Sequence, residues 1–377
     1  MSAEGSPSSI TTRQSKLRQA LKSSDLDGLV LNPGPSLTYL TGLHFHLMER
    51  PIVVIFTPDD TVFAVIPKLE AAKLKDISFP INAFYYGEDP ASWPEEFGDA
   101  LEATDLLGEY QIGVEPSRLR LLELRYLENA APKGSFVSAE QVLSSLRMYK
   151  DANEIKAMRK AAHIAQEALS ATLPSISVGA SEKEIASELT SQLLCYGSES
   201  NLPFFPIVAS GPNSANPHAT PTDRVFSPGD MLVIDWGATY HGYVSDITRT
   251  FAIGEVEDEL IQIYEAVARA NEAGRQVAKP GVTAGSVDAA ARQVIESAGY
   301  AKFFTHRTGH GLGMEGHERP YIRAGNKLPL APGMTFTVEP GIYLPNRNGV
   351  RIEDDVVITE DGSQSLTDFP RHLQVLG

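Results

Sequence analysis

Residues 233–251 have the sequence VIDWGATYHGYVSDITRTF, with strand-forming residues at both ends and a turn in the middle. Tyr240-His241-Gly242 is a natural turn, so the segment predicts a β-hairpin. A two-residue turn at Tyr240-His241 would place Asp235 directly opposite Asp246, with the carboxylates about 5 Å apart on one face. Like charges so placed destabilise a sheet unless one is protonated or a cation lies between them. The alternative is that the two carboxylates mark strand ends in water.

A second segment, residues 306–320 (HRTGHGLGMEGHERP), concentrates histidine and glycine. Three of the nine histidines, His306, His310 and His317, fall within twelve residues together with four glycines. This composition fits no simple amphipathic element, and glycine allows the backbone to approach a ligand closely. The segment therefore predicts a site lined by imidazoles rather than a set of unrelated loop histidines.

Two acidic strand-like segments follow, residues 334–343 (MTFTVEPGIY) and 349–358 (GVRIEDDVVI). Glu339 ends the first apolar strand, and Glu353 lies inside the second. Buried carboxylates usually need a partner, so both glutamates are candidate site residues. The neighbouring Asp354 and Asp355 are expected to be the solvated acids of this segment.

Together these segments supply four carboxylates and one imidazole that need metal to come together: Asp235, Asp246, His310, Glu339 and Glu353. Oxygen-rich ligation with one nitrogen suits Mn²⁺, Co²⁺, Fe²⁺ or Zn²⁺ better than copper. Four carboxylates neutralise two divalent ions, and such a pair activates water and polarises a carbonyl group. The combination predicts metal-assisted hydrolysis.

A weak internal repeat indicates how ligands from distant segments meet. Helical patterns near residues 151–173 and 257–278 are each followed by a second helix, which ends near Gly197 or Gly299, and then by strand-like segments. Ser181 and Glu184 form a capping box at the start of one of these second helices. The repeat predicts two helix-helix-strand-strand halves around a pseudo-twofold axis, with a central site that takes ligands from both.

At these residues the sequence resembles the pita-bread metallopeptidases, a family that includes Xaa-Pro aminopeptidases, prolidases, methionine aminopeptidases and creatinase. The matching motifs are D-x-G-x(8)-D from Asp235, H-G-x-G from His310, E-P-G-I-Y from Glu339 and R-I-E-D from Arg351. The resemblance spans residues 146–377 and implies an α+β catalytic domain with internal pseudo-twofold symmetry. All five metal positions are occupied, which favours a catalytic member over the metal-free creatinase.

The resemblance implies a role for each metal-binding position. Asp235 would chelate one ion, and Asp246 and Glu353 would bridge both. His310 and Glu339 would hold the other ion. The family implies two divalent ions, with manganese first and cobalt or zinc as alternatives.

The family's catalytic imidazoles match two histidines outside the metal set. His218, in Asn-Pro-His-Ala, matches the outer imidazole that steadies substrate and intermediate, although alone it would be an ordinary loop histidine. Glu339 or His317 would relay a proton to the proline nitrogen. His306 and Arg351 match positions that line a prolidase-like pocket.

The N-terminal part predicts a creatinase-like α/β domain at residues 11–145, after a short flexible tail at residues 1–10. Thr38-Tyr-Leu-Thr-Gly42 resembles a segment of prolidase-like members, whereas methionine aminopeptidases lack this domain. This leaves the proline-specific branch, an Xaa-Pro dipeptidase acting on a small peptide with proline in second position. The alternatives are an Xaa-Pro aminopeptidase acting on longer peptides, a different small-molecule hydrolase, or a non-catalytic metal-binding relative.

Composition limits the partners. The 377 residues carry a formal charge of -16, which repels phosphate backbones, and no Lys/Arg-rich run offsets it, so nucleic acid is not expected. The first residues have no basic region followed by an apolar run, so a signal peptide is not expected, and no apolar stretch approaches the length expected of a membrane span. Cys195 is the single cysteine, which fits a reducing compartment and predicts a cytoplasmic protein. The resemblance implies a homodimer.

A preference for dipeptides over longer peptides requires a cation that pairs with the free proline carboxylate of a dipeptide. Guanidinium suits this role because it donates two parallel hydrogen bonds. Arg351 lies two residues before Glu353, on the same face of a strand. Arg50 lies in the His44–Arg50 loop, which no motif explains, and is predicted to clamp the carboxylate together with Arg351. The alternative is that Arg50 is a solvated charge paired with Glu49.

Overall fold

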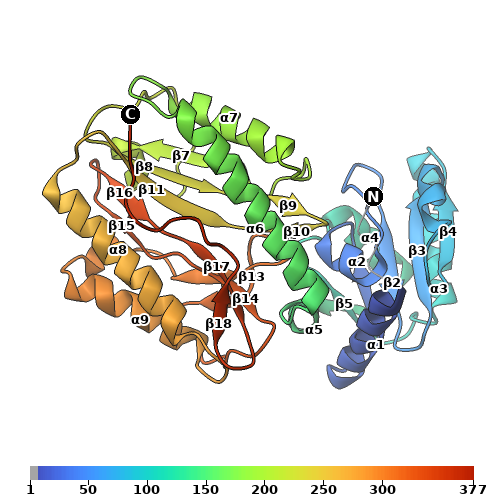
Figure 1. Ribbon diagram of the computed structural model, residues 1–377. Helices are drawn as coiled ribbons and strands as arrows, with labels where there is room; N and C mark the ends of the chain where they lie inside the picture. The colour runs from blue at the N-terminus through green and yellow to red at the C-terminus, as the bar shows by residue number, and fades with distance from the viewer. Residues whose placement is uncertain (1–6) are drawn as a thin grey trace. The chain divides into compact units, whose positions relative to one another are not determined.

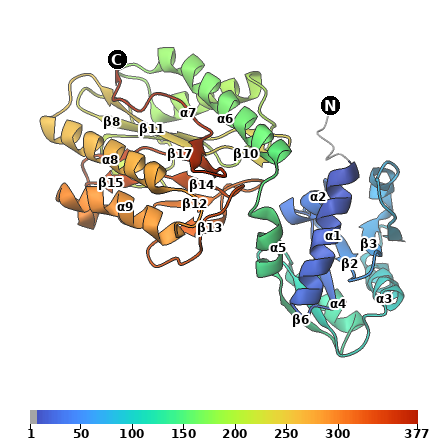
Figure 2. The same ribbon diagram turned by 60° about the horizontal axis from the view of Figure 1, so that its bottom comes forward.

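The computed structural model describes residues 7–377, which divide into two compact units between Arg147 and Met148 (Figures 1 and 2). Residues 7–10, expected in the tail, belong instead to the first helix, because Ile10 is buried close to Gly42. The remaining tail residues, 1–6, lie outside the described residues. In the described part of the chain, no helix is both long and apolar enough to cross a bilayer.

The first unit is built on one six-stranded mixed sheet in the order β4-β3-β2-β1-β5-β6. The antiparallel pairs are β1–β2 and β2–β3, and the other neighbours are parallel. The central strands are apolar and buried along their whole length, as expected of strands covered on both faces. This is the α/β domain that the sequence predicted.

The strands of this unit are β1 (Gly28–Leu31), β2 (Val53–Phe56), β3 (Val62–Pro67), β4 (Asn82–Tyr86), β5 (Gln111–Val114) and β6 (Ser135–Ser138). The α-helices are α1 (Pro7–Ser23), α2 (Pro35–Thr41), α3 (Trp93–Ala103), α4 (Leu121–Ala130) and α5 (Glu140–Arg147). Two 3₁₀ helices complete it, η1 (Lys68–Leu74) and η2 (Pro90–Ser92).

The second unit contains two pairs of packed helices. They are α6 (Ala152–Thr172) with α7 (Glu182–Cys195), and α8 (Asp258–Val277) with α9 (Ala284–Ser297). Short 3₁₀ helices lie at η3 (Leu173–Ser175), η4 (Gly211–Ala215) and η5 (Ala301–Phe303). The predicted capping box at the start of α7 is present, since the side chains of Ser181 and Glu184 each accept the other's backbone N–H. Both helix pairs precede strands, so the predicted repeat of elements is confirmed.

The strands of this unit form a sheet in the order β19-β11-β8-β7, a second in the order β13-β12-β14-β17-β18, and two short pairs, β9–β10 and β15–β16. Those of the first half are β7 (Ile207–Ser210), β8 (Met231–Trp236), β9 (Thr239–Tyr240), β10 (Tyr243–Val244) and β11 (Ile247–Ile253). Those of the second half are β12 (Gly309–Gly311), β13 (Glu318–Ile322), β14 (Thr335–Val338), β15 (Gly341–Tyr343), β16 (Gly349–Arg351), β17 (Asp354–Ile358), β18 (Ser363–Ser365) and β19 (Val375–Leu376).

Strand alternation in β8 decides which way its aspartate faces. Leu232, Ile234 and Trp236 pack with α6 and α7, and the Trp236 indole donates a hydrogen bond to the Ala165 carbonyl at 2.7 Å. Asp235 lies between two of these residues and therefore projects from the opposite face of the strand. The apolar side of β8 thus anchors the strand against helices while its other side reaches the centre of the unit.

Candidate metal centre

The hairpin that carries the two aspartates has a different register from the expected one. The turn is His241-Gly242, not Tyr240-His241, and both of its residues have positive φ (51° and 73°), as two-residue hairpin turns of this kind require. Asp235 therefore pairs with Thr248, so the predicted direct pairing of Asp235 with Asp246 is wrong. Because Asp246 lies two residues from Thr248, both carboxylates still line one cavity.

The glycine of this motif has a steric role. Strand pairing in this hairpin is interrupted between the Trp236–Ile247 pair and the Thr239–Val244 pair. The same register holds on both sides of this break and places Gly237 opposite Asp246. A Cβ on Gly237 would lie 2.1 Å from the Ser245 carbonyl oxygen, which is far inside van der Waals contact. Only glycine lets the two strand segments approach this closely beside Asp246.

The two glutamates occupy facing positions in another interrupted hairpin. On one side of the interruption Val338 pairs with Asp354, and on the other Gly341 pairs with Arg351. Extending either register places Glu339 opposite Glu353. Like charges directly opposite one another destabilise a sheet unless a cation lies between them. The cross-strand pair of acids is therefore the glutamate pair.

His310 completes the cluster from β12. Single ligand atoms of Asp246, His310 and Glu353 all lie within 4.8 Å of one another. The His310 Nε2 atom lies 3.4 Å from Glu339 Oε1 and 3.7 Å from Asp246 Oδ2. With Asp235, these residues line a cavity of about 750 Å³. The structure thus brings together all five predicted metal positions.

The electrostatics of the cluster favour a bound cation. Burial, together with repulsion from neighbouring carboxylates, raises the pKa of Asp246 and of Glu353 well above the usual range. Burial raises the pKa of Asp235 and brings that of Glu339 to about 7. Burial also lowers the pKa of His310, which keeps its imidazole neutral and able to ligate. Divalent ions would offset the repulsion that these carboxylates otherwise relieve by taking up protons.

One buried carboxylate oxygen supports the conclusion that the site fits a metal ion. Asp235 Oδ2 accepts a 2.6 Å hydrogen bond from the Arg351 guanidinium, whereas its Oδ1 is buried and has no hydrogen-bond partner in the described chain. Buried polar atoms are rarely left unpaired, so an unpaired carboxylate oxygen aimed at other acids fits a metal ligand. Across the site, the Thr248 hydroxyl donates to Glu353 Oε2 at 2.6 Å and orients that carboxylate.

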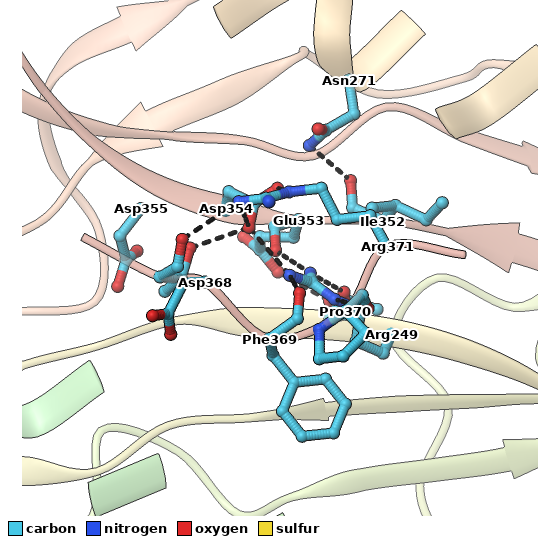
Figure 3. A network of polar contacts seen from close by, with 12 residues as sticks. Arg249, Asn271, Ile352, Glu353, Asp354, Asp355, Asp368, Phe369, Pro370 and Arg371 are labelled. Carbon is cyan, nitrogen blue, oxygen red and sulfur yellow. Dashed lines mark hydrogen bonds and ion pairs between the residues drawn. The ribbon is translucent and has the colours of Figure 1, made fainter. Parts of the chain in front are cut away.

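A buried ionic network fixes the strand that carries Glu353 (Figure 3). Arg249 is 1% exposed, donates to the Glu353 carbonyl at 2.6 Å and pairs with Asp354 at 2.9 Å. Arg371, near the end of the chain, pairs with the same carboxylate at 2.7 Å. Burial would raise the pKa of Asp354, but Arg249 and Arg371 outweigh it and hold that pKa below its usual range. Asp354 and Asp355 are both buried, so the expectation that they are solvated is wrong.

The three remaining predicted histidines also line the cavity. His218 is exposed in the segment after η4. The His306 ring contacts the Tyr343 hydroxyl at 2.9 Å, and burial lowers the pKa of His306 to about 4. The His317 ring packs on the His310 ring with a centroid separation of 4.0 Å. The predicted imidazole-lined site is therefore present in one cavity.

The two arginines predicted to bind substrate carboxylate both have partners in the structure. Arg351 is buried and donates to the Thr248 and Tyr343 hydroxyls, the Pro217 carbonyl and Asp235. Four of its five N–H groups are thereby engaged. Arg50, in the first unit, bonds Glu49 at 2.5 Å and Glu88 at 2.7 Å, so the alternative pairing with Glu49 is present.

Sequence reasoning missed a third arginine. Arg307 lines the cavity with its guanidinium 4.6 Å above the Tyr321 ring. Within the described residues, no carboxylate oxygen lies within 4.0 Å of it and its side chain makes no hydrogen bond. The position of Arg307 directly after His306 was the available signal.

Sequence reasoning also missed an apolar wall of the cavity, which includes Pro203, Phe204, Phe205 and Ile207.

Comparison with known proteins identifies the family. Residues 156–360 match the model of metallopeptidase family M24, and residues 13–149 match the creatinase/prolidase N-terminal domain. The chain therefore belongs to metallopeptidase family M24, as the motifs around the five acidic and imidazole ligands predicted.

Individual relatives match over nearly the whole chain. The protein is 40% identical to the probable dipeptidase PepE of Mycobacterium tuberculosis, over 95% of this chain and 94% of that protein. The prolidase from Thermococcus sibiricus is 35% identical with a TM-score of 0.92, covering 97% of this chain and 99% of that one. The X-Pro aminopeptidase from Thermotoga maritima is 32% identical with a TM-score of 0.83, covering 96% and 99%. These matches confirm the predicted two-domain pita-bread fold.

Proposed function

We propose that this protein is an Xaa-Pro dipeptidase that hydrolyses the bond before proline in a small peptide. The observation that carries the proposal is a cation without a carboxylate partner, Arg307, on the wall of the cavity that holds the five acidic and imidazole ligands. A dipeptide has its free carboxylate next to the scissile bond, where four carboxylates would otherwise repel it. Relatives described as a probable dipeptidase and a prolidase support the same activity.

Two divalent ions fit the site, manganese first, with cobalt or zinc as alternatives. Asp235 would hold one ion, His310 and Glu339 the other, and Asp246 and Glu353 would bridge them. Bound there, the ions would activate water and polarise the scissile carbonyl group. The unpaired Asp235 Oδ1 and the facing glutamates support this assignment.

The protein's own groups would then orient the substrate and move protons. Glu339 lines the cavity beside His310 and would exchange a proton with the substrate, as the family resemblance implies. His317 packs on His310 and would pass a proton to the proline nitrogen as the bond breaks. His218 and His306 line the cavity, where they would steady the peptide carbonyl and the departing proline.

The substrate's two ends would meet different surfaces. Arg307 would bind the proline carboxylate, held in place by its contact with the Tyr321 ring. The apolar wall that includes Phe204 and Phe205 suits the pyrrolidine ring or an apolar first residue. A clamping role for Arg351 or Arg50 stays a prediction, which their existing partners oppose because binding would require exchange of those bonds.

An Xaa-Pro aminopeptidase is the second candidate, because the Thermotoga maritima X-Pro aminopeptidase shares the fold. A homodimer in a cytoplasmic setting completes the proposal and rests on the family resemblance and the single cysteine. Light scattering of the purified protein would measure the oligomer directly.

Alanine release from Ala-Pro and from Ala-Pro-Ala, each with and without Mn²⁺, tests the proposed function, because cleavage before proline frees the N-terminal alanine of both peptides. A dipeptidase should release alanine from Ala-Pro in a metal-dependent reaction and act poorly on the tripeptide. Preference for Ala-Pro-Ala would establish the aminopeptidase instead. Activity on neither peptide, with metal bound, would point to a different hydrolase or a non-catalytic relative.

A further inference from the structure

One buried amide lies beneath both glutamate ligands. Asn271 on α8 is fully buried, and its amide nitrogen lies 2.8 Å from the Val338 carbonyl oxygen and 3.3 Å from the Ile352 carbonyl oxygen. Figure 3 shows the amide pointing at Ile352. Each carbonyl belongs to the residue directly before a glutamate of the metal site. Arg275 Nε donates to Asn271 Oδ1 at 2.8 Å, which orients the amide with its nitrogen toward the two carbonyls.

The amide contacts the strands where their own hydrogen bonding is interrupted. The Glu339 N–H donates to the Thr308 carbonyl and the Glu353 N–H donates to the Thr248 carbonyl, so neither glutamate donates across to the other's strand. Pro340 has no N–H to donate. The direct backbone bond over this stretch is a long one, from Ile352 N–H to the Pro340 carbonyl at 3.4 Å.

The interruption coincides with repulsion between carboxylates, because the register places Glu339 opposite Glu353 there and the charge of Glu339 raises the pKa of Glu353. Without a transverse tie, repulsion between two carboxylates would spread the strands apart. The Asn271 amide has two N–H groups and each carbonyl offers an acceptor, so one side chain joins both strands. An uncharged donor suits this place because it adds no charge to the metal ligands.

We infer that Asn271 is a positioning residue whose single amide sets the separation of Glu339 and Glu353 for a pair of divalent ions. The inference rests on the proposed function in taking both glutamates as metal ligands. Groups that orient metal ligands from behind typically contribute 10–100-fold in metal affinity, so the effect is measurable without turnover.

The test compares Asn271→Asp with a matched control, Gln276→Glu. Both replace an amide NH₂ by oxygen on the same helix, but Gln276 is exposed and bonds only Glu272. Asn271→Asp removes both donors and places oxygen against two carbonyl oxygens. Asn271→Ser is the second variant, because its one hydroxyl can donate to only one strand and adds no charge. Calorimetric titration of metal-free protein with Mn²⁺ and electron paramagnetic resonance of the loaded protein are the readouts.

Both Asn271 variants should bind Mn²⁺ about 10–100-fold more weakly than wild type, with an altered dimanganese spin-coupling signal, while Gln276→Glu stays within about twofold. Unchanged affinity and signal in both variants would overturn the inference. So would unfolding of both metal-free variants at 25 °C, which would make Asn271 a residue of the fold alone. If wild type binds no Mn²⁺, the proposed function fails instead, so the two failures are distinguishable.

Discussion

Arg307→Met should weaken the binding of Xaa-Pro dipeptides and leave Xaa-Pro-Xaa tripeptides nearly unaffected. Methionine keeps much of the apolar length that lies over the Tyr321 ring but removes the charge. In the described chain no carboxylate oxygen lies within 4.0 Å of Arg307, but its charge lowers the pKa of Glu339, so the tripeptide is needed as the control for an effect on the metal site. The change in dipeptide binding therefore reports the lost contact with substrate.

The size of the effect follows from the position of the side chain. A hydrogen bond to a charged group contributes about 1.5–3 kcal/mol, and partial exposure of Arg307 favours the lower part of that range. Since 1.4 kcal/mol corresponds to a factor of ten, kcat/KM for Ala-Pro should fall about 10–40-fold. Most of the loss should appear in KM, because the carboxylate is bound equally in the ground and transition states.

The assay measures alanine release from Ala-Pro and Ala-Pro-Ala by wild type, Arg307→Met and two other arginine variants. Arg50→Ala tests the sequence-based prediction, in which KM for the dipeptide rises about 10–100-fold while the tripeptide is unchanged or improved. Arg347→Met is the control, because Arg347 is exposed and, among the residues that the structure describes, forms ion pairs with Glu257 and Glu259 alone.

Three results would separate the possibilities. A selective loss on Ala-Pro in Arg307→Met alone supports Arg307 as the carboxylate-binding residue. The same loss in Arg50→Ala alone would assign that role to Arg50 and refute the reasoning from the cavity wall. A wild type that already prefers Ala-Pro-Ala would reject the dipeptidase reading altogether.

The remaining predictions concern the metal site. Glu353→Gln removes a bridging charge and should abolish turnover and lower bound metal; full activity with two metals by metal analysis would contradict the ligand assignment. His317→Ala should reduce kcat about 10²–10⁴-fold with normal metal content, whereas loss of metal would make His317 a ligand. Metal-free protein should melt at lower temperature as pH rises from 6.5 to 8, because burial raises the pKa of Glu339 to about 7 and the stability of its protonated form is lost as pH passes that value; below 6.5 the buried histidines, with lowered pKa values, oppose this trend. Calorimetric titration with Mn²⁺ should show metal affinity increasing as pH rises over the same range, since carboxylate and imidazole ligands bind metal when deprotonated.

Local features of the fold were predictable because short-range chemistry determines them. The capping box of Ser181 and Glu184 needs only residues of one helix turn, and it forms as predicted. The hairpin between Asp235 and Asp246 was also predictable, but its register was not. The turn moved by one residue because His241-Gly242 accepts positive φ at both positions, and that shift changed every pairing in the strands.

Features that depend on distant segments were not predictable from spacing. Asp354 and Asp355 begin β17 beside Glu353 and were expected to be solvated, yet Asp354 is buried, with Arg249 and Arg371 reaching it from remote parts of the chain. The direction of Arg307 into the cavity depends in the same way on the Tyr321 ring, which a sequence pattern does not place. That the five predicted metal positions come together in one cavity was predictable, because their residue types have few other uses in combination.

In both halves of the second unit, acidic side chains lie at or beside a point where the pairing of two strands is interrupted. Asp246 lies in the break between the β8–β11 and β9–β10 pairings, and Asp235 lies in the last paired residues of β8, opposite Thr248. The glutamates lie in the break between β14–β17 and β15–β16. Each break frees acidic side chains from regular cross-strand packing and lets them converge on the centre. At the break in the first half, Gly237 lets the two strand segments lie close together, because a Cβ there would clash with the Ser245 carbonyl oxygen. At the break in the second half, the Asn271 amide donates hydrogen bonds to both strand segments. The pseudo-twofold fold therefore builds one metal centre from two interrupted hairpins, each held together by a different device.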